Sequence, residues 1–177
     1  ELLDLLTSYF DFRTRRHVRL SNGQHTDTLI DRSWVQSPEK LRNLGSELAA
    51  KIPAPRKFKI WFVGFSVKEV DVVLTHADFG VLIADHVAAD LDARVVLAHT
   101  NPNVIRRGFK LRAGERALLV TDFDPFPCQK IQSLAEIAQE HRAIIYGIAS
   151  VVSLGPENLK MLRSYSPNVH VLAELDL

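Results

Sequence analysis

The feature that most constrains the fold is an alternation of apolar runs and amphipathic segments through the later two thirds of the chain. The run Val72–Leu74 is apolar enough to be buried on both faces of a sheet. Buried strands that alternate with amphipathic helices indicate a mostly parallel sheet with helices on both faces, so the expected fold class is α/β and Rossmann-like. The predicted strands are 58–65, 70–77, 93–99, 143–154 and 169–175, with a short strand, a glycine turn and a buried strand in 108–122. The predicted helices are 79–91, 128–142 and 157–165.

The first fifty residues precede this regular alternation. They predict a helix at 2–10, a hairpin in 17–32 centred on Asn22-Gly23, and a helix at 37–52. The last helix has a good start signal, because Ser37 can act as N-cap and Pro38 suits the first turn. Its apolar stripe consists of Leu41, Leu44, Leu48 and Ile52. We therefore expect one domain over 1–177, with 1–52 as a small helix–hairpin–helix cap (hood) and 53–177 as the α/β core.

Composition excludes several classes of protein. Of 177 residues, 46% are hydrophobic and 24% charged, and the net charge of +1 gives no field that favours nucleic acid or an anionic membrane. A single cysteine, Cys128, rules out an internal disulfide framework. No apolar run reaches the roughly 20 residues that span a bilayer, and the first ten residues lack the basic start of a signal peptide. We expect a cytoplasmic protein.

Ligands of such sheets bind outside the carboxyl ends of the strands, so the loops there are the places to look for a site. These loops are 75–80, 99–108, 121–129 and 153–158. His76, Asp78, Asp122 and Asp124 should lie at the same edge, where they are either a metal site or acid/base cluster, or solvated loop residues. Cys128 is either a reactive thiol near a helix N-terminus or an ordinary partly buried thiol.

Several blocks of the chain resemble the type I phosphoribosyltransferases, and orotate phosphoribosyltransferase most closely. The blocks are RLSNGQHTDTL at 19–29, DVVLTHADFG at 71–80, RRGFKLRAGE at 106–115 and the closing LAELDL at 172–177. The resemblance implies the fold of that family. It also implies transfer of ribose 5-phosphate from phosphoribosyl pyrophosphate to orotate, assisted by magnesium, in a homodimer.

The phosphate loop departs from the family pattern. Where the family has two acids, this chain has Thr121 and Asp122, so one carboxylate is missing. The phosphate turn falls on 125–129, in which Pro125 and Pro127 have no N–H to donate. Asp124 adds a negative charge where a phosphate dianion would bind. The resemblance leaves a remnant phosphoribosyl pyrophosphate site of Thr75, Asp122, Asp124, Cys128, Arg106 and Arg107.

The other two family loops have also changed. The pyrophosphate loop at 75–80 keeps only its last glycine, Gly80, and gains Asp78. The base-recognition Asp-Arg pair falls on Ser153 and Leu154, which cannot bind a carboxylate bidentately. The catalytic flexible loop is short, and His99 stands where the family usually has glutamate.

We therefore expect a related but catalytically inactive protein with a regulatory or partner-binding role, and we assign no catalytic residue. The alternatives are an active orotate phosphoribosyltransferase of pyrimidine biosynthesis, or a different ligand or reaction on the same scaffold. No cofactor is expected, except magnesium if the enzyme is active, and His76, Asp78 and Asp122 are weak metal candidates. A homodimer is expected, with an active relative as another possible partner and without nucleic-acid binding.

Overall fold

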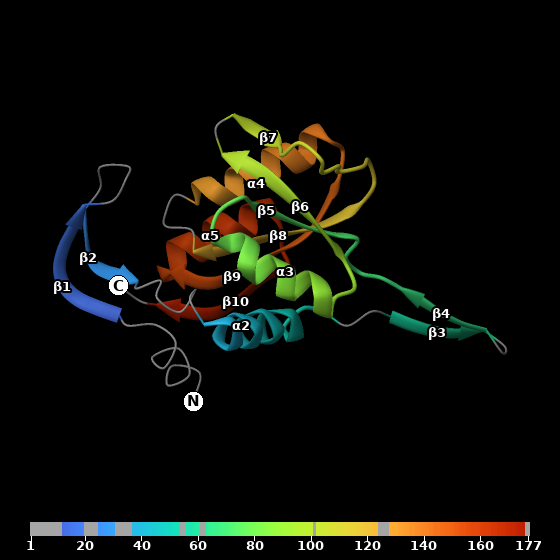
Figure 1. The fold of residues 1–177 in the computed structure, drawn as a ribbon, viewed down its shortest axis with the longest axis horizontal. Coiled ribbons are helices and arrows are strands. Elements are labelled where there is room, and N and C mark those ends of the chain that lie inside the picture. The colour runs from blue at the N-terminus through green and yellow to red at the C-terminus, as the bar shows by residue number, and fades with distance from the viewer. Residues whose placement is uncertain are drawn as a thin grey trace.

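A six-stranded sheet with the order β10-β9-β8-β5-β6-β7 organises the chain (Figure 1). All neighbouring pairs are parallel except β6 and β7, which are antiparallel. The computed structural model describes residues 12–19, 25–30, 37–53, 56–60, 63–100, 102–123 and 128–175. The strands of this sheet are β5 (Val72–His76), β6 (Arg94–Thr100), β7 (Asn103–Ile105), β8 (Arg116–Phe123), β9 (Ile144–Leu154) and β10 (Val169–Leu175). The predicted α/β class with a mostly parallel sheet is confirmed.

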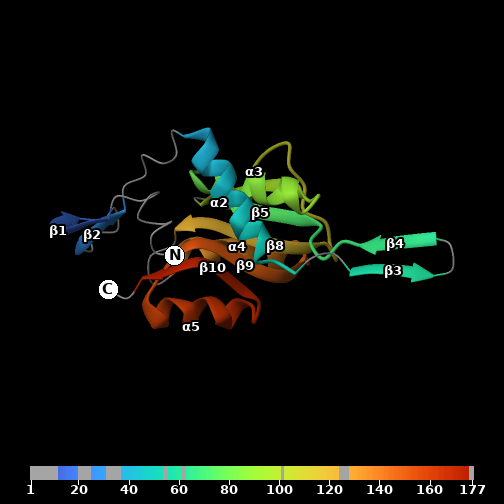
Figure 2. The ribbon, with the colours of Figure 1, turned by 90° about the horizontal axis from the view of Figure 1, so that it is seen from below.

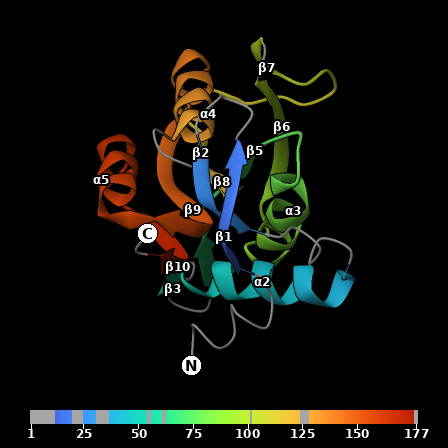
Figure 3. The ribbon, with the colours of Figure 1, turned by 90° about the vertical axis from the view of Figure 1, so that its left-hand side faces the viewer.

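Helices cover both faces of the sheet (Figures 2 and 3). One face carries α2 (Pro38–Ala50) and α3 (Gly80–Asp90), and the other carries α4 (Gln129–Glu140) and α5 (Gly155–Tyr165). Each layer has its own apolar cluster, because successive residues of a strand point to opposite faces of the sheet. Val73 of β5 therefore packs under α3, while its neighbour Leu74 packs under α4.

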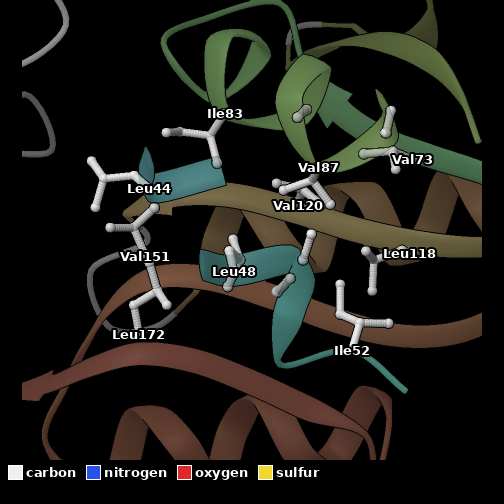
Figure 4. Close-up of a cluster of buried hydrophobic side chains, with 14 of the residues drawn as sticks. Leu44, Leu48, Ile52, Val73, Ile83, Val87, Leu118, Val120, Val151 and Leu172 are labelled. Carbon is white, nitrogen blue, oxygen red and sulfur yellow. The ribbon is translucent and has the colours of Figure 1, made fainter. Parts of the chain in front are cut away.

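The cluster under α2 and α3 consists of buried apolar side chains (Figure 4). Leu44 and Leu48 from α2 meet Ile83 and Val87 from α3 over Val120 of β8, and all five side chains are fully buried. Burial of each such aliphatic side chain contributes about 1.5–3 kcal/mol before the entropy of ordering is subtracted. This cluster fixes α2 and α3 on the sheet.

The start of α2 follows the sequence prediction closely. The Ser37 Oγ accepts a hydrogen bond from the Lys40 backbone N–H at 3.4 Å, and Pro38 is the first helical residue. The predicted apolar stripe is buried, from Leu41 with 7% exposed to Ile52 with 4%. The helix ends at Ala50, and Lys51 follows as its C-cap.

Two antiparallel hairpins lie outside the main sheet (Figure 1). The first joins β1 (Phe12–Arg19) to β2 (His25–Ile30), which confirms the predicted hairpin. Its Asn22-Gly23 turn and the predicted helix at 2–10 lie outside the described residues. The second hairpin joins β3 (Arg56–Ile60) to β4 (Val63–Val67). The division into a hood and a core stays a prediction.

Two strand predictions were wrong. The stretch 58–65 was expected to be one strand, but it is divided between β3 and β4, because apolar residues continue through both and give no signal of the reversal. The short strand expected after Gly108 is absent from the described segment 106–115. The chain turns there instead, with the Phe109 N–H donating to the Arg106 carbonyl at 3.0 Å and Gly108 at a φ of 96°.

The contact between α2 and α3 gives a first prediction. A Cβ added at Gly45 would lie 2.3 Å from the Cβ of His86, so the two helices can approach only because residue 45 has no side chain. Gly45→Ala should therefore lower the free energy of unfolding by about 1–3 kcal/mol, although alanine favours a helix. Chemical denaturation measures the change. The control Arg42→Ala, at an exposed position of α2, should change stability by less than about 0.5 kcal/mol, and equal effects of the two variants would contradict the prediction.

Candidate functional site

His76 and Asp122 meet at the carboxyl edge of the sheet. His76 is the last residue of β5, and Asp122 lies near the end of the adjacent parallel strand β8. Both residues are buried, with 3% and 2% of the whole residue exposed. The alternative that these two are solvated loop residues is therefore wrong. They are buried residues of strands β5 and β8.

A lysine joins the two acids of this edge. Lys130, in the first turn of α4, places its Nζ 2.8 Å from the Asp78 Oδ2 and 3.1 Å from the Asp122 Oδ1. The Asp122 side chain is 1% exposed, whereas those of Lys130 and Asp78 are 23% and 35% exposed. We call Asp78, Asp122 and Lys130 the Lys130 bridge. It connects α4, β8 and the turn before α3.

The Lys130 bridge also fixes the start of α3. The Asp78 Oδ1 accepts a hydrogen bond from the Gly80 backbone N–H at 2.9 Å, while its other oxygen holds Lys130. A Cβ at Gly80 would lie 2.9 Å from the Thr75 Oγ1 and 3.2 Å from the Asp78 Oδ1. The one glycine that this loop shares with the family pattern is thus required by packing within the protein itself.

Electrostatics keeps the bridge charged. Burial acts to raise the pKa of Asp78, but the hydrogen bond and charge of Lys130, with the Gly80 amide, outweigh it and hold that pKa below its ordinary value. Burial likewise acts to lower the pKa of Lys130, and the carboxylates of Asp122 and Asp78 outweigh it and raise that pKa. Both groups are therefore ionised at neutral pH.

His76 lies beneath the bridge in its neutral form. Its Nε2 is 3.1 Å from the Lys130 backbone carbonyl, so this nitrogen donates and the Nδ1 is left as an acceptor. Among the described residues the Nδ1 has no hydrogen-bond partner, and neither has the Oγ1 of Thr75, which is 1% exposed. Burial lowers the pKa of His76, opposed in part by the Lys130 carbonyl and Asp78.

These residues do not fit a metal ion. The His76 Nε2 faces a carbonyl oxygen, and the carboxylates of Asp78 and Asp122 converge on an ammonium group. Within the described parts of the chain, no group of three His, Cys, Asp or Glu side chains is placed to hold a metal. The weak metal candidates are thus brought together, but around Lys130. No step that requires magnesium follows from these residues.

Cys128 and Ser153 belong to a buried network. Cys128 is fully buried at the N-cap of α4 with a φ of 58°, and its thiol donates to the side-chain oxygen of Asn158. The Asn158 Nδ2 in turn donates to the Oγ of Ser153 at 3.3 Å, and Ser153 is fully buried. Neither side chain is available to a ligand. Asp124 and the two prolines at 125 and 127 lie outside the described residues.

Arg106 and Arg107 are exposed. The Arg106 N–H donates to the Leu97 carbonyl at 2.7 Å, and neither guanidinium has an ion pair with another residue that the structure describes. Arg106 lines a cavity of about 410 Å³ that Asp78 also borders. Of the remnant site, Asp122 thus lies in the Lys130 bridge, and Arg106 lines a cavity that Asp78 of the bridge borders.

The β6–β7 hairpin occupies the place of the shortened loop. The Asn103 Nδ2 donates to the Glu136 Oε2 at 3.1 Å, and the Ser133 Oγ donates to the Asn103 Oδ1 at 2.8 Å. These bonds fasten the hairpin to α4. His99 is exposed on β6 opposite Val104 of β7.

Sequence reasoning missed Lys130, the central residue of the site. A signal was available, because a cation in the first turn of a helix faces the positive end of the helix dipole. The first turn of α4 has no acid of its own to compensate. Such a lysine needs carboxylates from elsewhere in the fold, and Asp78 and Asp122 were the nearest acids at the same sheet edge.

The sheet order, the helices on both faces and the polar edge above β5 and β8 define the class of protein. This is the type I phosphoribosyltransferase fold. Adenine phosphoribosyltransferase from Thermoanaerobacter pseudethanolicus superposes with a TM-score of 0.71 at 12% identity, covering 98% of this chain and 99% of that one. Orotate phosphoribosyltransferase from Aeropyrum pernix gives a TM-score of 0.65 at 14% identity, covering 98% and 94%.

Sequence comparison narrows the relationship, and the chain is related to orotate phosphoribosyltransferases. The enzyme of Caldanaerobacter subterraneus is 34% identical over 109 residues, which cover 60% of this chain and 50% of the relative. That of a Thermoanaerobacter species is 27% identical over 139 residues, covering 77% and 66%. The match thus spans between half and about two thirds of these relatives' length. No protein-family model matches the chain.

The Lys130 bridge gives a second prediction. Lys130→Met would leave the carboxylates of Asp78 and Asp122 together without a cation, and removal of one partner from a buried pair costs about 3–5 kcal/mol. Because Asp78 and Lys130 are partly exposed, we expect a loss of about 2–4 kcal/mol in the free energy of unfolding. Lys68→Met is the matched control, since it removes an exposed pair with Asp92 and should cost less than about 1 kcal/mol. Equal losses in a denaturant titration would refute the assignment.

Two histidines, the buried His76 and the half-buried His170, give a third prediction, on pH. Burial lowers the pKa of His76, and it also lowers that of His170, with Lys51 adding to the effect. The unfolded chain therefore takes up protons first, so stability is complete above about pH 6.5 and falls as the pH drops toward the lowered values.

Urea titrations between about pH 7 and pH 5 test this sign, with a limiting slope of about 1.4 kcal/mol per pH unit for each histidine. His76→Gln keeps a donor for the Lys130 carbonyl but does not titrate, so its slope should be shallower than that of the wild type. A wild-type stability that is flat over this range, or an unchanged slope in the variant, would disprove the prediction.

Proposed function

We propose that this chain is a phosphoribosyltransferase-fold protein, related to orotate phosphoribosyltransferase, that does not catalyse phosphoribosyl transfer and has a regulatory or partner-binding role. The observation that carries the proposal is the Lys130 bridge. At the edge where the family binds its sugar phosphate, the only cation of the bridge is already held by two carboxylates.

Electrostatics opposes a phosphorylated ligand at this edge. One ammonium and two carboxylates leave a net charge of −1, so the positive charge of Lys130 is not available to a dianion. An anionic oxygen about 4 Å from Asp78 would meet a repulsion of about 4 kcal/mol at an effective dielectric constant near 20. A ligand of this kind would have to break the bridge before it could bind.

The loop sequences support the same proposal. Thr121 replaces one of the two family acids, and the prolines at 125 and 127 remove amide donors from the phosphate turn. Ser153, at the base-recognition position, is buried in the network with Asn158. These two loops, and the pyrophosphate loop at 75–80, which keeps only Gly80 of the family's glycines, thus lack groups that the resemblance implies for the family reaction. The strands and helices that hold them remain.

One observation favours a second candidate, an active orotate phosphoribosyltransferase of pyrimidine biosynthesis. The identity of 34% over 109 residues is to a protein of that name. In this case magnesium would be needed, and ribose 5-phosphate would pass from phosphoribosyl pyrophosphate to orotate. The enzyme would have to bind its substrate without the usual phosphate turn.

Assembly and location form part of the proposal. The family resemblance supports a homodimer, or a complex with an active relative, in the cytoplasm. The net charge of +1 gives no support to a nucleic-acid partner. In the described parts of the chain, every helix is too short or too polar to cross a membrane.

A fourth prediction separates the two candidates. Titration with phosphoribosyl pyrophosphate and Mg²⁺ in a calorimeter should give no binding in the micromolar range, and incubation with orotate should yield no nucleotide. The orotate phosphoribosyltransferase from Aeropyrum pernix, run in parallel, is the positive control for both measurements. Micromolar binding, or steady conversion of orotate to its nucleotide, would establish the active enzyme instead.

A further inference from the structure

We propose that the β3–β4 hairpin binds in the interface of an anionic lipid surface, with its apolar face toward the lipid. This inference concerns attachment of the chain to a membrane surface and goes beyond the function proposed above. It rests on the two strands Arg56–Ile60 and Val63–Val67 and on the register that pairs them. Figures 1 and 2 show this hairpin extending away from the layered part of the molecule.

The hairpin has no other described element to pack on. Among the described helices and strands, β3 and β4 make substantial contacts only with each other. They form a sheet of their own, separate from the six-stranded one. An isolated two-stranded hairpin is marginally stable in water and gains stability from a third strand or from a surface that covers one face. A further surface that covers the hairpin would therefore stabilise it.

The register of the hairpin separates apolar from basic residues. Paired residues share a face, and successive pairs lie on opposite faces. Three pairs that are mostly apolar lie on one face, namely Arg56–Val67, Phe58–Phe65 and Ile60–Val63. Two pairs that each contain a lysine lie on the other face, namely Lys57–Ser66 and Lys59–Gly64. The ribbon is thus amphipathic.

The hairpin also carries a positive charge. Residues 56–67 contain Arg56, Lys57 and Lys59 and no acid. The net charge of +1 for the whole chain conceals this, because the other 19 basic and 21 acidic residues give −2. An anionic lipid surface attracts nearby lysines and arginines. Its field extends about 8 Å at physiological salt, which is comparable to the roughly 10 Å between packed sheets. Cations on both faces of a single ribbon can therefore contribute.

Two other kinds of partner fit this pattern less well. A single-stranded nucleic acid stacks its bases on aromatic rings in a positively charged groove, so rings and cations should share a face. Here Phe58 and Phe65 lie on the face opposite Lys57 and Lys59. A protein could cover the apolar face, but it would leave the two lysines without a role. Interfacial segments of membrane-bound proteins combine an aromatic apolar face with lysines on the polar face.

The edges of the hairpin limit how deeply it can enter. Since β3 and β4 pair only with each other among the described strands, each has one edge without a neighbouring strand. Backbone N–H and C=O groups that lack a hydrogen bond are costly in hydrocarbon. At the level of the lipid headgroups, water and headgroup oxygens can bond to them. We therefore expect the hairpin to lie in the headgroup region and not to cross the bilayer.

Sedimentation with lipid vesicles tests the attachment. At low salt the wild type should bind vesicles that contain phosphatidylglycerol, and it should bind vesicles of phosphatidylcholine alone much more weakly. Phe58→Ser should lower the partition coefficient by roughly 10-fold or more, because burial of one aromatic side chain is lost. Phe79→Ser is the matched control and should leave binding unchanged. Phe79 is 46% exposed but follows the carboxyl end of β5, whereas the hairpin precedes the amino end of β5.

The lysines give a second measurement. Lys57→Gln/Lys59→Gln should weaken binding to the anionic vesicles by roughly 25-fold at low salt, about fivefold for each cation. The matched control Lys160→Gln/Arg163→Gln removes two exposed cations of α5 and changes the net charge equally, but it should weaken binding by less than about threefold. Added salt should reduce the difference between these double variants. Thermal melts check that all variants remain folded.

Tryptophan fluorescence reports on the hairpin directly. The chain has two tryptophans, and Trp61 falls between β3 and β4 in the sequence. In Trp34→Phe the tryptophan emission comes from Trp61 alone. It should move to shorter wavelength when anionic vesicles are added, because the indole ring prefers the membrane interface to water.

A wild type that does not bind anionic vesicles at low salt, binding that survives Phe58→Ser, or equal losses in the matched controls would overturn the inference. An unchanged Trp61 emission in the presence of vesicles would do the same. If the wild type instead binds a single-stranded oligothymidylate and no vesicle, and Lys57→Gln/Lys59→Gln removes that binding, the partner is a nucleic acid and this inference is wrong. The calorimetry with phosphoribosyl pyrophosphate does not bear on these results, so either proposal can fail alone.

Discussion

The arrangement of the carboxyl edge depends on one interaction, the contact of the Lys130 ammonium with Asp78 and Asp122. Two carboxylates at the ends of neighbouring elements repel each other unless a cation lies between them. A metal ion can supply that cation, but here a side chain of α4 supplies it. Since the cation is the side chain of Lys130, it cannot leave the protein as a metal ion can. Its charge is already balanced by the carboxylates of Asp78 and Asp122. The bridge is an internal contact among the turn before α3, β8 and α4, at the edge that the proposed function leaves without a sugar phosphate.

The fold and the site depend on different properties of the sequence. The two apolar clusters need only aliphatic side chains of suitable size at the alternating positions of each strand, and many sequences satisfy that requirement. This explains how a TM-score of 0.71 is reached at 12% identity. A phosphate site needs amide donors and particular side chains at single positions. Exchange of a few loop residues can therefore remove the chemistry, while side chains such as Leu44, Val87 and Leu118 continue to pack.

The same difference explains which features could be predicted from the sequence. The helix at α2 and the buried strand β5 were predictable because their signals, a cap, a stripe and a continuous apolar run, are local. The β3–β4 reversal was not, since its apolar residues show no break. Parallel topology was enough to bring His76 and Asp122 to one edge. Their burial and the role of Lys130 depend on how α4 packs above the sheet, and the spacing of residues along the chain does not contain that information.

The Lys130 bridge also bears on the outer surface of the molecule. Asp78 uses one oxygen to hold Lys130 and the other to accept the Gly80 N–H at the start of α3. Phe79 lies between these two residues in the chain, so the contact that closes the inner edge also determines where the exposed phenylalanine stands. A hydrogen bond and an ion pair of Asp78 thus hold the first turn of α3, although no side chain of its N-cap residue caps it. On the proposed function, the carboxylate of Asp78 therefore has two roles, since it opposes an anion at the inner edge and holds the start of α3.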